Sequence, residues 1–338
     1  MQKNNLLSII IPTYNSQNTI QTPLLSINNS QFKNFNNIEV IVVDDKSKDR
    51  TLKKIREVES GLKYKLTIYP SRRNYGPAKA RNFGVKKARG SYILFLDSDV
   101  ELAKSTLRYA YLLAKDKKVK AFTGIWHYRQ KTNKFFPQFK AMRDWVYWFI
   151  EREKYARYYL FSTRIAGIEK KLFQKIGGFD EDFPQATVED IELTYRIEKE
   201  AKIRFSPELM IYHEFEDFWP IAKKYFRRSR DWIILYQKRL RFDPVATSKK
   251  EAFKALLAGL IVMSLIFGLF DVLFFYLAFI FILQFTNLEW YFWTFVLKQK
   301  GWLFLLKSIF FSIILYLIID MGSLWGLLIS RFYKRDVS

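Results

Sequence analysis

The fold is indicated by the stretch Tyr92-Ile93-Leu94-Phe95-Leu96-Asp97-Ser98-Asp99. Its five apolar residues are too few for a helix, so they predict a short buried strand. Two aspartates, one residue apart, follow where this strand ends. Carboxylates in this position can hold Mg²⁺ or Mn²⁺ against a diphosphate, because both ions prefer oxygen ligands. A solvated turn with capping aspartates is the alternative interpretation.

Two earlier stretches repeat this arrangement of an apolar run followed by polar residues. Residues 6–11 end in Pro12-Thr13-Tyr14-Asn15, and residues 39–43 end in Asp44-Asp45. Helical stretches lie between the strands at residues 18–29, 49–60 and 77–88, with a weaker strand near residues 66–69. Strands that alternate with helices predict an α/β domain with a mainly parallel, Rossmann-like sheet. Ligands bind beyond the carboxyl ends of such strands, so the three polar clusters predict one site.

The residues of these clusters suggest a nucleotide as the ligand. Asp44 and Asp45 could accept hydrogen bonds from a uracil or guanine N–H and from ribose hydroxyls. Residues 73–82 open a helix with Gly76 and Pro77 at its start. The amino end of this helix and its cations, Arg81 among them, could bind phosphate. A basic helix face is the alternative interpretation of Arg81.

The motifs together resemble the family 2 glycosyltransferases of GT-A fold. The resemblance is carried by Ile9-Ile10-Ile11-Pro12-Thr13-Tyr14-Asn15, by Val42-Val43-Asp44-Asp45-Lys46-Ser47-Lys48-Asp49-Arg50-Thr51 and by Asp97-Ser98-Asp99. Gly177-Gly178-Phe179-Asp180-Glu181 followed by Val188-Glu189-Asp190 resembles the acceptor-side half of the same family. The match covers about residues 5–215.

The resemblance implies a nucleotide-sugar donor, either a UDP-sugar or a GDP-sugar, and Mg²⁺ or Mn²⁺ as cofactor. It assigns the metal and diphosphate contacts to Asp97 and Asp99, with Ser98 between them in the donor site, and the catalytic base to Asp190. In many GT-A enzymes a late histidine completes the metal site, which suggests His213 as a third ligand. It further implies nucleotide contacts from Pro12, Tyr14, Val43 and Asp45.

The chemistry of the expected reaction also suggests Asp190 as the catalytic base. Direct displacement at an anomeric carbon inverts its configuration and needs a group that takes the proton of the attacking hydroxyl. The alternative is that Glu189, Asp190 and Glu192 are acids at a helix start, where they are favoured in any case. His213 could likewise be a structural histidine, and His127, which carries no motif, is interpreted as structural.

The composition points to anionic partners and to a membrane. The formal net charge is +23, aromatic residues make up 18% of the chain, and cysteine is absent. Such a charge suggests nucleic acid, phospholipid head groups or phosphorylated substrates. Many basic residues flank the apolar segments, so we expect membrane lipids as partners and no nucleic acid.

The composition changes near Ser248, where the predicted glycosyltransferase domain (1–247) gives way to a transmembrane helical region (248–338) with a short cytoplasmic tail. Residues 255–270, 272–285 and 308–329 are apolar runs, and residues 288–297 are rich in aromatics and interpreted as interfacial. Basic flanks, including Lys334 and Arg335, favour two or four crossings. The expected location is therefore multi-pass in the cell membrane, with the catalytic domain cytoplasmic. A buried helical subdomain is the alternative.

Residues 218–242 mix aromatic and basic side chains, which is typical of a helix at a membrane surface. Within them, residues 227–232 are similar to the QxxRW motif of processive polysaccharide synthases, but no Gln leads and Asp231 separates Arg230 from Trp232. Arg228 or Arg230 could still bind a leaving diphosphate or an acceptor phosphate, because a guanidinium forks onto phosphate oxygens. A helix that only faces lipid is the alternative.

These observations predict an inverting, metal-dependent transferase that acts on a polyisoprenyl phosphate or a lipid-linked glycan. A processive polysaccharide synthase and a non-catalytic membrane scaffold that kept the fold are the alternatives. The sugar, the nucleotide, the acceptor, the number of crossings and the oligomeric state are left open by the sequence.

Overall fold

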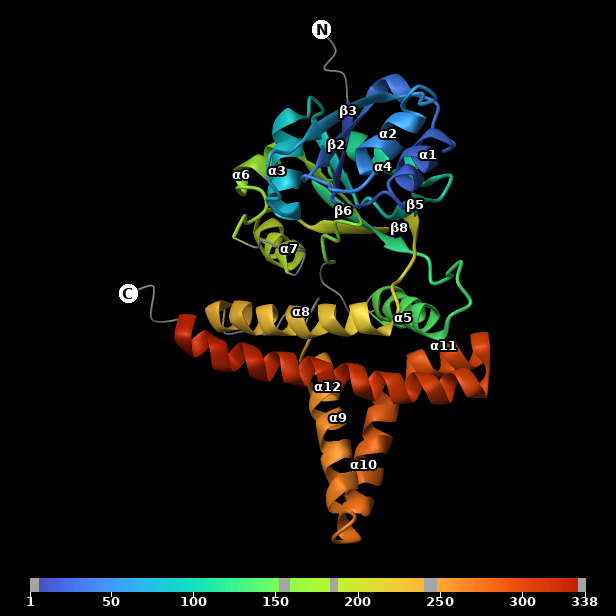
Figure 1. Cartoon of the computed structure of the whole chain (residues 1–338), viewed down its shortest axis with the longest axis vertical. Coiled ribbons are helices and arrows are strands. Elements are labelled where there is room, and N and C mark those ends of the chain that lie inside the picture. Colours follow the sequence, from blue (N-terminus) through green and yellow to red (C-terminus); the bar gives the residue numbers. More distant parts are fainter. Residues whose placement is uncertain (1–5, 152–158, 183–187, 240–247, 334–338) are drawn as a thin grey trace. The chain divides into compact units, whose positions relative to one another are not determined.

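The computed structural model describes residues 6–151, 159–182, 188–239 and 248–333, and Figure 1 shows its elements. The chain forms two compact units. The first, here called the sheet unit, comprises Met1–Gln130 and Arg157–Glu214. The second, the helical unit, comprises Lys131–Ala156 and Phe215–Ser338. The predicted boundary between residues 247 and 248 stays a prediction.

The sheet unit is built on an eight-stranded mixed sheet of order β3-β2-β1-β4-β7-β6-β8-β5. Strands β3, β2, β1 and β4 run parallel, and β7 joins β4 and β6 in the antiparallel direction. This architecture confirms the predicted fold class. The strands are β1 (Leu7–Thr13), β2 (Ile38–Asp44), β3 (Lys65–Pro70), β4 (Tyr92–Leu96), β5 (Val100–Leu102), β6 (Ala121–Trp126), β7 (Ile165–Glu169) and β8 (Ile203–His213).

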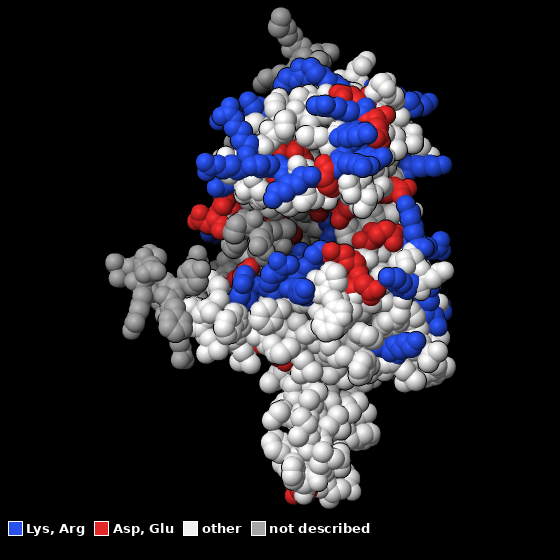
Figure 2. Space-filling model, in the orientation of Figure 1, with Lys and Arg blue, Asp and Glu red and all other residues white. Residues whose placement is uncertain are grey.

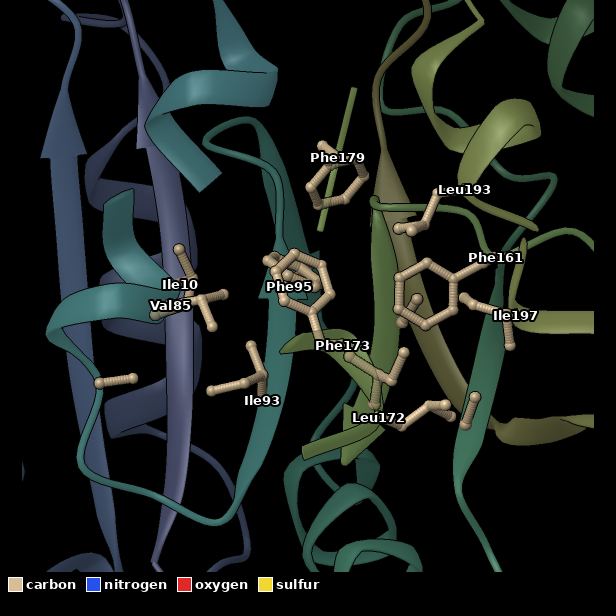
Figure 3. Packing of buried hydrophobic residues seen from close by; sticks show 14 of the residues in the cluster. Ile10, Val85, Ile93, Phe95, Phe161, Leu172, Phe173, Phe179, Leu193 and Ile197 are labelled. Atoms are coloured by element: carbon tan, nitrogen blue, oxygen red, sulfur yellow. The ribbon is translucent and has the colours of Figure 1, made fainter. Parts of the chain in front are cut away.

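Strands β1, β2 and β4 are buried along their whole length, which is why they are apolar without alternation. Phe95 on β4 lies at the centre of the core (Figure 3). Its ring centroid is 6.0 Å from that of Phe161, 5.5 Å from that of Phe173 and 5.2 Å from that of Phe179. Strand β4, which Asp97 directly follows, is therefore packed against the segment that carries Phe179.

The helices of the sheet unit follow the strands as expected for crossover connections. They are α1 (Gln21–Asn28), α2 (Thr51–Glu59), α3 (Pro77–Lys87), α4 (Thr106–Lys115), α6 (Lys170–Lys175) and α7 (Glu189–Glu200). Helix α3 begins at Pro77, directly after Gly76, whose φ of 89° is a conformation that other residues rarely adopt.

The helical unit consists of helices only among its described residues. They are α5 (Phe135–Trp145), a π-helical segment (Val146–Glu151), α8 (Phe218–Arg239), α9 (Lys249–Phe267), α10 (Leu273–Leu288), α11 (Trp290–Lys300) and α12 (Trp302–Tyr333). By length and composition, one described helix, Trp302–Ser330, could cross a membrane. A second span is possible if α10 and α11, which are bent by 75°, count as one.

Candidate active site

The loops that follow β1, β2 and β4 are tied together at one edge of the sheet. The backbone N–H of Asn15 donates to Ser47 Oγ at 2.9 Å, and the N–H of Lys48 donates to Asn15 Oδ1 at 2.8 Å. The hydroxyls of Ser16 and Ser98 lie 3.1 Å apart. The structure therefore brings the three predicted polar clusters into one place, because parallel strands end at the same edge.

Asp44, the last residue of β2, and Asp45, which follows it, are both buried but have different partners. Asp44 accepts hydrogen bonds from the backbone N–H of Ser47, at 3.1 Å, and from its hydroxyl. Asp45 accepts from the N–H groups of Tyr75, at 2.8 Å, and Gly76, at 2.7 Å. Asp45 thus holds the loop that leads into α3. The carboxylate oxygens of Asp45 have further lone pairs that could accept hydrogen bonds from a nucleoside. This predicted contact stays a prediction.

The other predicted nucleotide contacts differ in exposure. Tyr14 is 44% exposed at the end of β1, where its ring is available to a ligand. Pro12 is buried, and the side chain of Val43 belongs to the hydrophobic core, so Val43 would reach a nucleotide only through its backbone. These three roles stay predictions.

Asp97 and Asp99 lie on either side of a turn between β4 and β5. Val100 on β5 is the antiparallel partner of His213, the last residue of β8. This pairing places His213 Nε2 3.3 Å from Asp99 Oδ2. Asp97 Oδ1 accepts a hydrogen bond from Arg81 at 2.9 Å instead. The late histidine therefore lies next to the second aspartate of the motif, and the roles of Asp97, Asp99 and His213 as metal ligands stay predictions.

The donor atoms of these residues determine whether they could hold a metal ion. No group of three His, Asp or Glu side chains gathers closely enough to hold an ion in the described parts of the chain. Asp99 and His213 are as close as two ligands of one ion, since ligand distances near 2.1 Å place neighbouring ligands about 3 Å apart. Asp97 would be the third ligand, and its role and the cofactor, Mn²⁺ or Mg²⁺, stay predictions.

Arg81 on α3 is the central cation of the site. Its side chain is 4% exposed and pairs with Asp97 at 2.9 Å and with Glu189 Oε1 at 3.1 Å. Its guanidinium also lies 5.5 Å from the centre of the Phe179 ring. Burial alone would lower the pKa of Arg81, but Asp97, Glu189 and then Asp190 outweigh it and raise that pKa above its ordinary value. Arg81 therefore stays charged and joins two motifs.

A second link between α3 and the acceptor-side motif comes from Asn82. Its Nδ2 donates to the carbonyl of Phe179 and its Oδ1 accepts from the N–H of Phe179, both at 2.9 Å. Gly178 adopts a φ of 71°, and a Cβ there would lie 2.7 Å from Asn82 Oδ1. This close approach explains the second glycine of the Gly177-Gly178-Phe179 motif. The roles of Asn82 and Glu189 were missed by sequence analysis, because contacts between distant segments leave no local pattern.

Asp190 is the second residue of α7. The hydroxyl of Thr194 donates to its backbone carbonyl at 2.6 Å and accepts from the N–H of Phe161 at 2.9 Å. The start of α7 is thereby fixed against the segment that precedes β7. The side chain of Asp190 is partly exposed, and its charge is near enough to contribute to the raised pKa of Arg81. Its position is compatible with the predicted base.

The remaining predicted residues lie elsewhere. Arg228 and Arg230 are on α8 in the helical unit, and Arg230 pairs with Asp231 at 2.6 Å. Their predicted phosphate contacts stay predictions. His127 Nδ1 accepts a hydrogen bond from the N–H of Arg129 at 3.0 Å, and burial followed by the charge of Arg129 lowers its pKa. This environment is compatible with the predicted structural role of His127.

The sequence model of Glycosyl transferase family 2 matches residues 8–177 of this chain. The chain belongs to this family. The matched residues include β1 without its first residue and all of β2 to β7, and therefore the Asp97-Ser98-Asp99 motif. The match ends at Gly177, the first residue of the glycine motif.

Among family 2 relatives, an uncharacterized glycosyltransferase of Haemophilus influenzae is 41% identical over 103 residues, which are 30% of this chain and 39% of that protein. The poly(ribitol-phosphate) β-N-acetylglucosaminyltransferase TarS of Staphylococcus aureus is 39% identical over 103 residues, 30% of this chain and 18% of TarS. The match thus spans less than two fifths of either relative.

Solved structures share the fold of this family 2 chain. The mannosyltransferase PcManGT of Pyrobaculum calidifontis, in complex with GDP-Man and Mn²⁺, has a TM-score of 0.54 at 17% identity and covers 97% of this chain and 86% of its own. TarS 1-349 of S. aureus, in complex with UDP-GlcNAc, has a TM-score of 0.50 at 23% identity and covers 68% of this chain and 66% of its own. At these identities the likeness concerns the fold.

Proposed function

We propose that this chain is an inverting, metal-dependent glycosyltransferase. It moves a sugar from a UDP- or GDP-sugar to a polyisoprenyl phosphate or a lipid-linked glycan at the cytoplasmic face of a membrane. The observation that carries the proposal is the buried Arg81, which pairs with the donor-side Asp97 and with Glu189 beside Asp190. A scaffold without catalysis would not need a buried cation between these two motifs.

In the proposed reaction, the donor nucleoside lies over the loops that follow β1 and β2, with Tyr14 and Asp45 against it. The acceptor oxygen attacks the anomeric carbon from the side opposite the diphosphate. The bond between the acceptor oxygen and this carbon forms while the bond from the carbon to the phosphate oxygen breaks. A carboxylate oxygen of Asp190 takes the proton of an acceptor hydroxyl, and the nucleoside diphosphate leaves with the bonding electron pair.

Asp97, Asp99 and His213 would hold Mn²⁺ or Mg²⁺, which neutralises negative charge on a diphosphate leaving group. Arg81 keeps Asp97 in place through its hydrogen bond of 2.9 Å, and the Ser16–Ser98 contact of 3.1 Å fixes the turn between the aspartates. Arg81 acts through Asp97 and Glu189, so it is a positioning residue.

The donor class is supported by the fold neighbours, whose structures were solved in complex with GDP-Man and with UDP-GlcNAc. The membrane and the lipid-linked acceptor are supported by the helical unit, whose helices α9, α10 and α12 expose many large apolar side chains. Soluble monomers rarely expose contiguous apolar patches of this extent. The net charge of +23 suits anionic lipid head groups and a phosphorylated acceptor.

The test uses detergent-solubilised protein, Mn²⁺ or Mg²⁺, labelled UDP- and GDP-sugars, and polyisoprenyl phosphate. Label is expected to move into the organic phase with the native chain and with the control Asp116→Asn, an exposed aspartate whose side chain accepts from the N–H of Lys118 and pairs with Arg204. It should be lost in Asp99→Asn. Donor hydrolysis without lipid label would point to a glycan acceptor, and no binding of any donor would favour the scaffold.

Asp190→Asn separates the two acceptor classes. A sugar hydroxyl needs a base, and a positioned base contributes about 10²–10⁴ in rate, so hydroxyl transfer should fall by that factor. A phosphate acceptor is already ionised at neutral pH, so its transfer should fall much less. Unchanged hydroxyl transfer by Asp190→Asn would rule out Asp190 as the base.

A further inference from the structure

The α9–α10 hairpin exposes apolar side chains along its length. Leu269 and Phe270 at its tip are 77% and 84% exposed. On the face shown in Figure 2, the hairpin carries almost no charged atoms apart from red ones at its end. Ring contact between Phe267 and Phe274, at 5.4 Å, closes the hairpin, so both helices return to the same side. This surface fits the hydrocarbon of a bilayer.

Helix α12 is the described helix that passes the length and composition test for a membrane span. Taken alone, it would be assigned as a crossing. Its large exposed side chains are also apolar, for example Leu306 at 62% and Leu324 at 60%. Its neighbours contradict that assignment.

Helix α12 is packed lengthwise against α8. A Cβ on Gly322 would lie 2.4 Å from the carbonyl oxygen of Phe226, and one on Gly326 would lie 2.7 Å from that of Arg230. These two glycines, four residues apart, let the two backbones touch, as small residues do at tight helix interfaces. The residue numbers rise together on both helices, so α8 and α12 run parallel and side by side (Figure 1).

The contact between these helices is long. The ring of Phe311 on α12 lies 5.4 Å from that of Phe218 at the start of α8. From Phe311 to Gly326, at a rise of 1.5 Å per residue, α12 therefore follows α8 for about 22 Å. A bilayer's hydrocarbon core is only about 30 Å thick. If α12 crossed the core, most of α8 would have to enter it.

Helix α8 cannot enter hydrocarbon, because it is strongly basic. Lys223, Lys224 and Arg227 are exposed on it. Each charged side chain costs about 2.5–3.5 kcal/mol at the centre of a membrane helix on insertion scales. At a membrane surface the same side chains contact lipid phosphates. Helix α8 therefore stays at the head groups, and α12, which is bound along it, stays at one depth.

Helix α9 meets α12 at one place instead of following it. The hydroxyl oxygen of Tyr316 on α12 lies 2.9 Å from Glu251 Oε2 on α9, and 2.8 Å from Glu289 Oε1 between α10 and α11, so its single hydrogen can be donated to either carboxylate. A turn further on, Asp320 Oδ2 lies 3.6 Å from the position of a Cβ on Gly259. Beyond that crossing, α9 continues for eight residues to Phe267, about 12 Å, away from the layer of α8 and α12 (Figure 1).

We propose that the α9–α10 hairpin is the part of the chain that enters the bilayer, and that α12 lies parallel to the membrane surface beneath α8 without crossing it. The inference rests on the proposed membrane association. It does not depend on the sugar or on the acceptor. Both ends of α12 then lie on the same side of the membrane, which agrees with the predicted even number of crossings.

The absence of cysteine allows a direct depth measurement. Leu306→Cys and Leu324→Cys lie eighteen residues apart on the same face of α12, a distance of about 27 Å. The variants are spin-labelled and reconstituted into vesicles of phosphatidylethanolamine and phosphatidylglycerol. Electron paramagnetic resonance then compares accessibility to oxygen and to a water-soluble nickel chelate. Leu303→Cys and Met321→Cys, which are also exposed and eighteen residues apart, form a second pair in case one variant fails to fold.

The two labels on α12 are expected at closely similar depths. On α9, a label at Met263→Cys should lie about 10 Å deeper than one at Leu256→Cys, because these exposed residues are two turns apart. Depths on α12 that differ by about 25 Å would overturn the inference and leave the membrane association standing. If all labels were in water, both the inference and the proposed membrane association would be overturned. Sugar transfer to a soluble acceptor would be unaffected by that result.

Discussion

Replacement of Arg81 is expected to destabilise the sheet unit strongly. Arg81→Met keeps most of the side-chain volume but removes the cation between Asp97 and Glu189. Glu189 is buried, so its carboxylate loses the ion pair with Arg81 without gaining water, whereas Asp97 is partly exposed. Removal of one partner of a buried ion pair costs about 3–5 kcal/mol. For a unit of this size, that corresponds to a fall of about 6–20 °C in melting temperature.

The assay is thermal unfolding in detergent, followed by circular dichroism, with Lys79→Met as the matched control. Lys79 lies on the same helix, but its pair with Glu181 is long, at 4.0 Å, and exposed. Such pairs contribute about 0–1 kcal/mol, so the control should melt close to the native chain. Equal shifts for Arg81→Met and Lys79→Met would refute the reasoning.

A double variant separates the ion pair from loss of packing. If the cost of Arg81→Met comes from the lost ion pair with the buried Glu189, Glu189→Gln added to it should recover part of the stability, because a neutral amide is easier to bury than a carboxylate. The two changes should then be non-additive by about 1 kcal/mol or more. Strict additivity would show that Arg81 and Glu189 do not interact energetically.

Three further predictions concern other parts of the chain. His213→Ala should weaken activation by Mn²⁺ at least tenfold in a titration of transfer rate against metal, whereas His127→Ala should leave the midpoint unchanged. Gly322→Ala should destabilise the helical unit by about 1–3 kcal/mol in chemical unfolding, because the added methyl meets the backbone of α8, whereas Gly259→Ala makes only an ordinary contact of 3.6 Å. Burial would raise the pKa of Glu39, but hydrogen bonds from Ser8 and Arg89 outweigh it and lower that pKa below 4.5. The charged form of Glu39 therefore stabilises the fold above pH 4.5, and this contribution is lost as the pH falls through the lowered pKa. Glu39→Gln should cost about 1–3 kcal/mol at pH 7 and should flatten the acid loss of stability in unfolding curves; an unchanged acid profile would contradict this.

The parallel half of the sheet could be predicted from sequence because its strands are buried on both faces. The predicted strand at residues 92–96 is β4, and the predicted runs at residues 6–11 and 39–43 fall within one or two residues of β1 and β2. The strands β6 and β7 were not predicted. Each holds a glycine packed against a neighbour, Gly124 and Gly167, so their sequences are short and uneven. Their pairing also joins segments far apart in the chain, which no local period records.

The site was predicted as a set of motifs, and the structure adds the contacts that join them. Residues Asp97 and Asp190 each stand out in their own segment. That Arg81 lies between Asp97 and Glu189 depends on a contact over 108 residues of sequence. The partners of Asp45 could not be predicted from its own segment either, because its hydrogen bonds to Tyr75 and Gly76 require the turn before α3 to be in place. Residue type and spacing indicate the chemistry, whereas packing determines which polar groups meet.

The same distinction applies to the helical unit. A hydropathy window measures one helix at a time, and by that measure α12 has the composition of a crossing helix. The depth of a helix in a bilayer also depends on every helix bound along it, because they move together. Helix α12 is held to a basic neighbour for about 22 Å, so the charges of Lys223, Lys224 and Arg227 limit the depth of both helices. Between its crossing with α12 and the end of α10, the α9–α10 hairpin carries one charged residue, Asp271 at its tip. It is therefore the element that is free to enter hydrocarbon.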